Sequence, residues 1–461
     1  SSEIPTGKQH RGKKMGGIFY EKITGIWQTV WLEFVPDVYL TREETFITAD
    51  PFTGEIIARI KISDQDKGFK VVESQAFDGD KEITPIGHIT DIFGYHNSGP
   101  PLIQEIKLQA NPKDITSWNP DHPELYRLRF NLIDGDADEG EIIDYMDWTF
   151  GFRKVEVKGK KFLLNGESIF QKQALYQGYW PDGAWTAPSD KLMRKDLELT
   201  LEMGFNGLRM HQIVPDPRFY YHADELGVLL WGEMSNAFGN TRKAKVRLVN
   251  EWQAVVCRDR CHPSIVTWTP INESWGTGDL SKVNNQNWLR SLYYMTKSLD
   301  PTRPISENDG WEHVLTDIAS IHDYALPEEW VKHWPKEPSN LSEFLTNLAF
   351  GHGKFAPGCT SRGEPVSISE WGGWSMNIDA LNSANDKEKG WGYHGLMFED
   401  FGDILDLYEK IIKEIAKRKS YIIAHCYTEF CDQYQEMNGM LTFDRRPKGD
   451  LTRLKEINDL L

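Results

Sequence analysis

The spacing of hydrophobic residues along this chain changes near residue 150. Between residues 37 and about 149, apolar and polar positions alternate in short runs such as Glu55–Ile62 and Leu125–Leu132. Turn-forming clusters such as Asp50–Gly54 separate these runs. Alternation with a period of two indicates half-buried strands, and short strands at this spacing are typical of an antiparallel sandwich. We therefore predict an antiparallel β-sandwich over residues 37–149.

From Gly151 onward, apolar runs of strand length alternate with longer amphipathic segments. The predicted strands are Ile169–Tyr176, Gly207–His211, Val228–Glu233, Ile265–Ile271, Pro304–Ser306, Ser320–Tyr324, Pro365–Ser369 and Ile422–Thr428. The predicted helices are Asp190–Met203, Pro217–Leu226, Lys243–Arg260, Ser281–Leu299 and Asp403–Arg418. Eight strands that alternate with helices over about 300 residues predict an eight-stranded β/α barrel, the TIM barrel, over residues 150–461.

The first 36 residues contain two further strand-like runs, Ile18–Tyr20 and Gly25–Phe34. Two strands are too few to form a domain. We therefore expect residues 1–36 to be the end of a β domain whose earlier strands are missing from this chain.

Two of the predicted barrel strands end in a glutamate. Glu273 follows Trp268–Asn272 and is followed by Ser-Trp-Gly, and Glu370 follows Pro365–Ser369 and is followed by Trp-Gly-Gly. Carboxylates at the carboxyl ends of barrel strands lie at the mouth, where such barrels carry their active sites. A pair of them suits acid/base and nucleophilic work on a glycosidic bond. The plainer interpretation is that both glutamates only bond neighbouring loops.

The amino-acid composition argues against some classes of binding partner. The formal net charge of −17 argues against nucleic acid, which needs a basic face, and no apolar run is long enough to span a membrane. The five cysteines show no zinc-ligand spacing and are expected to be reduced thiols. The N-terminus has no apolar stretch that resembles a signal peptide, which favours the cytoplasm. A signal lost upstream would instead make the protein secreted, and a homo-oligomer stays open.

Several motifs together resemble the family 2 glycoside hydrolases, the group of β-galactosidases, β-glucuronidases and β-mannosidases. In the barrel region they are Gly151–Arg153, Leu164–Gly166, Gly204–Arg209, Ala223–Glu233, Arg258–Ile265, Asn272-Glu273, Glu370–Gly372, Tyr427–Gln433 and Asn438–Lys448. Trp118–Tyr126 is similar to the end of the family's immunoglobulin-like domain, and Thr24–Trp31 to the end of its N-terminal jelly roll. The resemblance runs in order along almost the whole chain.

The resemblance implies three parts: a jelly-roll remnant at 1–36, an immunoglobulin-like β-sandwich at 37–149 and a TIM-barrel catalytic domain at 150–461. It implies a retaining, exo-acting hydrolase of terminal β-glycosides, with Glu273 as general acid/base and Glu370 as nucleophile. We expect burial and a nearby negative charge to keep one carboxyl protonated, and Arg209 to keep Glu370 ionised. The other expected substrate-binding residues are Asn272, Tyr324, His322, Gln212, Trp371, Gln177, Trp275 and Glu429. No metal or cofactor is expected.

Two departures from the family pattern bear on the substrate. The usual Arg-x-Ser-His reads Arg209-Met-His-Gln212, so Gln212 stands where an imidazole is expected. The family's Asn-x-Lys clamp for a sugar carboxylate is not evident between Gly439 and Lys448, which disfavours a glucuronide. We expect a β-galactoside-like substrate, with a furanoside, a mannoside or a glucuronide as alternatives. A carbohydrate-binding protein without turnover is the alternative of another class.

Overall fold

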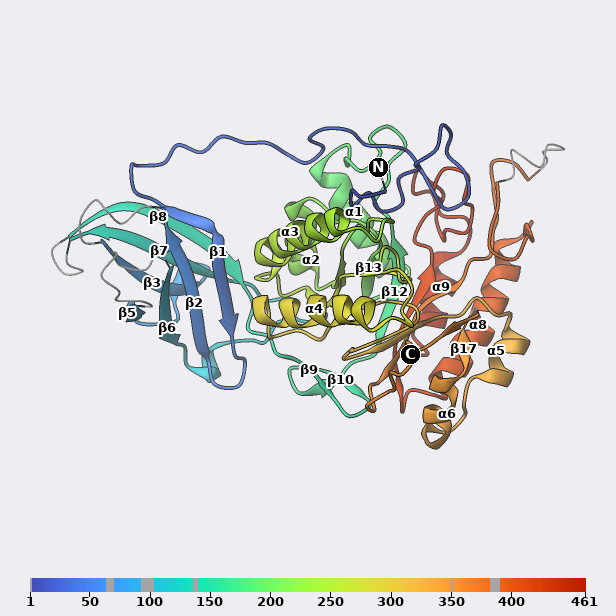
Figure 1. The fold of residues 1–461 in the computed structure, drawn as a ribbon. Coiled ribbons are helices and arrows are strands. Elements are labelled where there is room, and N and C mark those ends of the chain that lie inside the picture. The colour runs from blue at the N-terminus through green and yellow to red at the C-terminus, as the bar shows by residue number, and fades with distance from the viewer. Residues whose placement is uncertain (1, 64–69, 93–102, 136–139, 350, 382–389) are drawn as a thin grey trace.

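The computed structural model describes residues 2–63, 70–92, 103–135, 140–349, 351–381 and 390–461. Figure 1 shows three parts: an antiparallel β domain on one side, a larger α/β domain, and an N-terminal segment. This segment runs over the α/β domain before it crosses to the β domain.

The antiparallel domain follows the predicted alternation of apolar and polar residues. Its strands are β1 (Leu40–Ala49), β2 (Glu55–Ile62), β3 (Lys70–Asp78), β4 (Lys81–Glu82), β5 (Gly87–Ile92), β6 (Ile103–Gln109), β7 (Tyr126–Asp134) and β8 (Glu141–Phe150). They pair in the order β1-β2-β6-β5-β3-β7-β8, with β4 beside β3. In β2 the alternate residues Ile56, Ala58, Ile60 and Ile62 are fully buried. Side chains from both halves of the sheet form one buried cluster, so the domain has its own core.

The α/β domain is TIM-barrel-like, with seven parallel strands in one sheet. In chain order the strands are β12 (Gln171–Tyr176), β13 (Gly207–Met210), β14 (Leu229–Glu233), β15 (Ile265–Thr269), β16 (Ala319–His322), β19 (Val366–Gly372) and β20 (Ile422–Thr428). They pair in the order β15-β14-β13-β12-β20-β19-β16. Small sheets of β9 (Val155–Lys158), β10 (Lys161–Leu164) and β11 (Glu167–Ser168), and of β17 (Leu348–Ala349) and β18 (His352–Gly353), accompany it.

The predicted strand Pro304–Ser306 is wrong as a full strand of the sheet. Ile305 forms only an isolated bridge with Trp268, and Asp309 forms another with Asn272. Pro304 lacks a backbone N–H, and a polar run follows Ile305, so this segment offers little for a strand ladder. It nevertheless lies in the gap between β15 and β16, because the Gly310 carbonyl accepts from the backbone N–H of His322 at 3.3 Å.

The five predicted helices are present within about two residues of their expected bounds, and three shorter helices were not predicted. They are α1 (Asp190–Glu202), α2 (Pro217–Leu226), α3 (Arg242–Asp259), α4 (Val283–Leu299), α5 (Pro327–His333), α6 (Leu341–Thr346), α8 (Phe401–Ala416) and α9 (Leu451–Asn458). The single-turn helices are η1 (Pro112–Asp114) and η2 (Pro338–Asn340). Asp216 caps α2, and Gly227 ends it in the left-handed conformation. Within the described ranges, no helix combines the length and apolar character of a membrane span.

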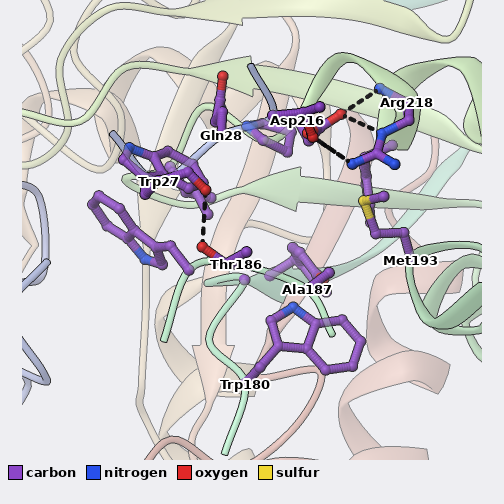
Figure 2. A pocket seen from close by; sticks show the side chains of 15 residues that line it. Trp27, Gln28, Trp180, Thr186, Ala187, Met193, Asp216 and Arg218 are labelled. Atoms are coloured by element: carbon purple, nitrogen blue, oxygen red, sulfur yellow. Dashed lines mark hydrogen bonds and ion pairs between the residues drawn. The ribbon is translucent and has the colours of Figure 1, made fainter. Parts of the chain in front are cut away.

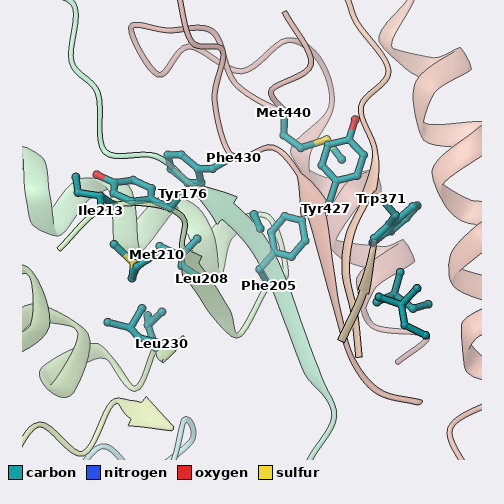
Figure 3. Close-up of a cluster of buried hydrophobic side chains, with 14 of the residues drawn as sticks. Tyr176, Phe205, Leu208, Met210, Ile213, Leu230, Trp371, Tyr427, Phe430 and Met440 are labelled. Carbon is teal, nitrogen blue, oxygen red and sulfur yellow. The ribbon is translucent and has the colours of Figure 1, made fainter. Parts of the chain in front are cut away.

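A cluster of large apolar side chains packs the barrel strands against the helices. Leu208 and Met210 of β13 lie in it with Tyr176 of β12 and Phe430 after β20 (Figure 3). Their burial fixes the strands, and the strand ends carry the site described below. All five cysteines are unpaired thiols, as the sequence analysis expects.

The N-terminal segment differs from its prediction. Residues 25–34 form no strand, and Ile18–Tyr20 make only isolated bridges. Apolar side chains such as Leu32 and Phe34 are exposed, because no neighbouring strand covers them among the described residues. The segment is held by docking instead: Thr186 donates to the Trp27 carbonyl at 2.9 Å beside a cavity of about 50 Å³ (Figure 2).

Candidate active site

Glu370 lies at the end of β19 and is almost fully buried among hydrogen-bond donors. Its Oε1 accepts from Arg209 Nη1 at 2.9 Å, and its Oε2 accepts from the Tyr324 hydroxyl at 2.7 Å. Burial alone would raise the pKa of Glu370, but the charges of His322 and Arg209 lower it below its usual value. The geometry therefore holds Glu370 as an ionised carboxylate.

Glu273 stands after β15 with a left-handed backbone, φ 51°, which is uncommon for a residue with a side chain. Its backbone N–H donates to the Asp309 carbonyl at 2.8 Å. Its Oε1 lies 2.9 Å from Nδ1 of His322, and Nε2 of the same ring lies 2.7 Å from Asp309 Oδ1. The imidazole thus bridges two carboxylates that come from different segments of the chain.

His322 decides the charge of Glu273 in the free protein. Burial opposes a charge on this imidazole, yet the surrounding carboxylates raise its pKa to about 10. Burial likewise favours a protonated Glu273, but the hydrogen bond and charge of His322 lower the pKa of this carboxyl. In the free protein the contact with His322 thus works against the expectation that one carboxyl of the pair stays protonated.

The two candidate catalytic carboxylates are close together. One oxygen of Glu273, one oxygen of Glu370 and a nitrogen of His322 all lie within 4.8 Å of one another. Carboxyl groups that are about 5–5.5 Å apart suit a retaining glycosidase, whereas inverting enzymes need about 6.5–9.5 Å. The same three residues have the spacing of a metal site, but a metal would have to displace the proton between His322 and Glu273.

Arg209 on β13 is fully buried, and its guanidinium group binds several polar side chains of the site. Besides Glu370 it contacts Glu233, through Nε at 2.8 Å, and Asn272, through Nη2 at 2.7 Å. The Oδ1 atom of Asn272 is thus occupied, whereas its Nδ2 is buried without a hydrogen-bond partner among the described residues. Leaving a buried donor without a hydrogen bond costs about 1–3 kcal/mol, and a bound group that accepts from this amide would remove that cost.

Gln177, after β12, and Glu429, after β20, form a second polar group at the mouth. Gln177 Nε2 donates to Glu429 Oε2 at 2.7 Å and to the Tyr20 hydroxyl at 3.1 Å. The Tyr20 hydroxyl in turn donates to Glu436. Within the described part of the chain, Gln177 Oε1 and Glu429 Oε1 are buried without hydrogen-bond partners. Burial and the charge of Glu436 raise the pKa of Glu429 well above its usual value.

Two expected sugar contacts are wrong. Trp371 is 1% exposed and packs against Trp374, Tyr408 and Tyr427, in the cluster that Figure 3 shows. Neighbouring residues of a strand point to opposite faces of the sheet, so Trp371 points away from Glu370 and its ring packs in the core. Gln212 is fully buried, and its amide pairs with Asn236 through both its nitrogen, at 3.0 Å, and its oxygen, at 2.7 Å.

The imidazole that faces this part of the site belongs to His211, whose Nδ1 lies 3.7 Å from Glu370 Oε1. The roles of the other expected residues in binding substrate stay predictions. Trp275 is partly exposed beside Phe238, with ring centroids 4.4 Å apart. The site residues that sequence reasoning missed are His211, Asp309, Tyr20 and Glu436. The polar residues that follow Pro304 could have indicated Asp309 as a site residue, whereas no sequence feature near Tyr20 indicates that it lies at the site.

Tyr324→Phe tests the account of Glu370 without leaving a cavity. The change removes one hydrogen bond to the charged carboxylate, so the pKa of Glu370 should rise and activity should be lost at a higher pH on the acidic side. One such bond is worth about 1.5–3 kcal/mol, and we expect kcat/KM to fall about 10- to 150-fold. The measurement is a pH profile of kcat/KM; an unmoved acidic limb would show that Tyr324 does not stabilise the charged form.

Comparison with known proteins places this site in a family. The model of the family described as "Glycosyl hydrolases family 2, TIM barrel domain" matches residues 155–460. A putative β-glucuronidase of Formosa agariphila is 28% identical over 296 residues, 60% of this chain and 33% of that protein. A β-galactosidase of Photobacterium profundum is 26% identical over 319 residues, 64% of this chain and 29% of that protein. The chain thus spans about a third of the length of these curated relatives.

Solved structures share the fold over almost the whole chain. A β-glucuronidase from Bifidobacterium dentium, complexed with coumarin-3-O-glucuronide, superposes with a TM-score of 0.70 at 21% identity, covering 92% of this chain and 67% of that one. A β-galacturonidase from Eisenbergiella tayi, bound to galacturonate, gives 0.70 at 19% identity, covering 93% of this chain and 73% of that one.

Proposed function

The chain belongs to glycosyl hydrolase family 2, and from this premise we propose that it is a retaining, exo-acting hydrolase of terminal β-glycosides. The observation that carries the proposal is the pair of carboxylates, Glu273 and Glu370, with oxygens within 4.8 Å of each other. Glu370, ionised and held by Arg209 and Tyr324, is suited to attack the anomeric carbon. Glu273, the more exposed of the two, is suited to protonate the leaving group.

The hydrogen bond between His322 and Glu273 supplies the proton for this step in our proposal. While Glu370 is charged, it helps to raise the pKa of the His322 imidazole. As Glu370 forms a bond to the sugar, that negative charge is lost, and the pKa of His322 should fall. His322 can then pass its proton through Glu273 to the departing oxygen. The unpartnered Nδ2 of Asn272 is placed to donate to the sugar 2-hydroxyl.

We expect His322→Asn to shift the alkaline side of the pH profile. In the unchanged protein the proton is held with a pKa of about 10, so kcat/KM should persist well above neutral pH. Without the imidazole, the proton must reside on Glu273 alone, whose pKa lies lower, and activity should be lost at a lower pH as the pH rises. General-acid help is worth about 10²–10⁴-fold, so a loss within that range is expected at alkaline pH. An alkaline limb in the same place would contradict the proton-holding role.

Neutral sugars are the substrates we propose, with a β-galactoside-like sugar first. Glu429 and Glu436 are buried at the mouth near Tyr20, and the unpartnered oxygen of Glu429 suits a hydroxyl donor, which a sugar carboxylate lacks. Lys448 is not placed to bind a sugar carboxylate, since its ammonium already binds Asp432 Oδ1 at 2.5 Å. The docked N-terminal segment covers this side of the mouth, which supports action on a terminal sugar. We also propose an immunoglobulin-like sandwich for residues 37–149, on the strength of its antiparallel pairing.

A panel of p-nitrophenyl glycosides tests the function directly. It should contain the β-galactoside, β-glucoside, β-mannoside, β-glucuronide, β-galacturonide and α-arabinofuranoside, each assayed for released nitrophenolate. We expect turnover of a neutral β-glycoside, with the β-galactoside hydrolysed faster than either uronide. Turnover of a uronide alone would overturn the substrate class. No turnover of any member, together with sugar binding measured by calorimetry, would favour a carbohydrate-binding protein instead.

A further inference from the structure

The N-terminal segment approaches the barrel closely at Gly7. The backbone N–H groups of Thr6 and Gly7 both donate to the Asn236 carbonyl, at 3.2 and 3.1 Å. Gly7 has a φ of +52°, and a Cβ at this position would lie 2.5 Å from the Gln212 carbonyl oxygen. Only a residue without a side chain allows this approach. The close packing fixes the next residue, Lys8, against the loops that follow β13 and β14.

Lys8 is a largely buried lysine whose ammonium group makes no direct hydrogen bond or ion pair with the described residues. The residue is 5% exposed, and its carbonyl accepts from the Tyr20 N–H at 2.8 Å. Its Nζ lies 5.1 Å from the centroid of the Trp275 ring, a cation–π distance. Within the described residues, Nζ has neither a hydrogen-bond acceptor nor an ion-pair partner. The buried side-chain atoms without partners do not include Nζ, so the ammonium keeps some contact with solvent, and a ligand oxygen could accept a hydrogen bond from it.

The surroundings of Lys8 place it inside the site, outside the matched barrel region 155–460. Its charge is among the causes that lower the pKa of Glu273, and it opposes the burial that raises the pKa of Glu429. It therefore acts on both the acid/base carboxylate and the polar group around Gln177. Tyr20, from the same segment, hydrogen-bonds Glu436 and Gln177. Two side chains of the N-terminal segment thus belong to the mouth of the barrel.

We propose that Lys8 is a specificity-determining residue whose ammonium donates a hydrogen bond to a hydroxyl oxygen of the terminal sugar. The inference rests on the proposed glycosidase function and identifies the segment that completes its sugar site. A hydroxyl both accepts and donates, so one group can accept from Lys8 and donate to the unpartnered oxygen of Glu429. A sugar carboxylate can only accept, so it has no hydrogen to donate to that oxygen of Glu429. A hydroxyl satisfies both groups, so Lys8 and Glu429 together favour a neutral, hydroxylated sugar.

The test compares Lys8→Met with a matched control, Lys245→Met. Lys245 on α3 also holds its ammonium over an indole, at 5.3 Å from the Trp288 centroid, but belongs to no part of the site. We expect Lys8→Met to lower kcat/KM for the best nitrophenyl glycoside about 10- to 150-fold, as for loss of one charged hydrogen bond. Lys245→Met should match the unchanged protein. Lys8→Arg, which keeps a charged donor, should recover part of the loss.

Deoxy sugars distinguish a direct contact from an indirect effect of charge. With the unchanged protein, removing the contacted hydroxyl from the substrate should lower kcat/KM; with Lys8→Met, removing that same hydroxyl should cost little more. Equal deoxy effects in both proteins at every position would overturn the inference, as would Lys8→Met activity equal to that of Lys245→Met. An unchanged protein that hydrolyses no glycoside would instead overturn the proposed function. If Lys8→Met lowers the melting temperature strongly, the deoxy comparison is made with Lys8→Arg, in which the deoxy effect should persist but be weaker.

Discussion

Glu370→Ala should nearly abolish hydrolysis, with kcat reduced by about 10⁴-fold or more, because no covalent glycosyl intermediate can form. The vacated space lies on the face of the sugar opposite the leaving group. Added azide should enter there, restore release of nitrophenolate and give a glycosyl azide of inverted configuration. The measurements are nitrophenolate release with and without azide, and NMR of the product.

A control separates this effect from a general loss of a carboxylate. Glu251 lies on α3, away from the barrel mouth, and Glu251→Ala should leave kcat unchanged and show no response to azide. Melting temperatures should establish that both variants are folded. Residual activity in Glu370→Ala within tenfold of the unchanged protein would rule out Glu370 as the nucleophile.

Glu273→Ala should have an effect that depends on the leaving group. Nitrophenolate departs without protonation, so such substrates should be largely spared in the first step, while a natural alkyl glycoside should lose about 10²–10⁴-fold. The covalent intermediate on Glu370 then persists, and azide should intercept it to give a product of retained configuration. Rates for substrates of graded leaving-group pKa, with NMR of the azide product, make the measurement. An inverted azide product from Glu273→Ala would mean that the two roles are exchanged.

The sequence predicts the parts of the fold that have long, regular patterns. Helices such as Pro217–Leu226 agree to the residue, because a capping Asp216 and a terminal Gly227 mark both ends. The segment after Pro304 and the run Gly25–Phe34 are the failures. Both contain apolar residues at strand spacing, but a strand also requires a neighbour to pair with, and pairing is a property of the whole fold.

The site residues likewise divide into those that the sequence predicts and those that it does not. Glu273, Glu370, Asn272, Arg209 and Tyr324 converge because each stands at the end of a parallel strand, and strand ends meet at one edge. The expectation for Trp371 failed because the predicted strand ended at Ser369, whereas β19 continues to Gly372, so Trp371 alternates with Glu370 and faces the core.

The sequence also provides no means to predict that Lys8 and Tyr20 lie at the site. Tyr20 meets Glu436 across 416 positions of the chain, and no local pattern reports such a contact.

The most direct test of the central claim, that Glu370 is the nucleophile of a retaining glycosidase, is covalent trapping in the unchanged protein. A 2-deoxy-2-fluoro glycoside with a good leaving group slows hydrolysis of the intermediate more than its formation, so the labelled protein can be digested and its peptides sequenced by mass spectrometry. We predict one sugar per chain, on the peptide that contains Glu370. A label on any other residue, or turnover without a trapped intermediate and with an inverted product, would contradict this account.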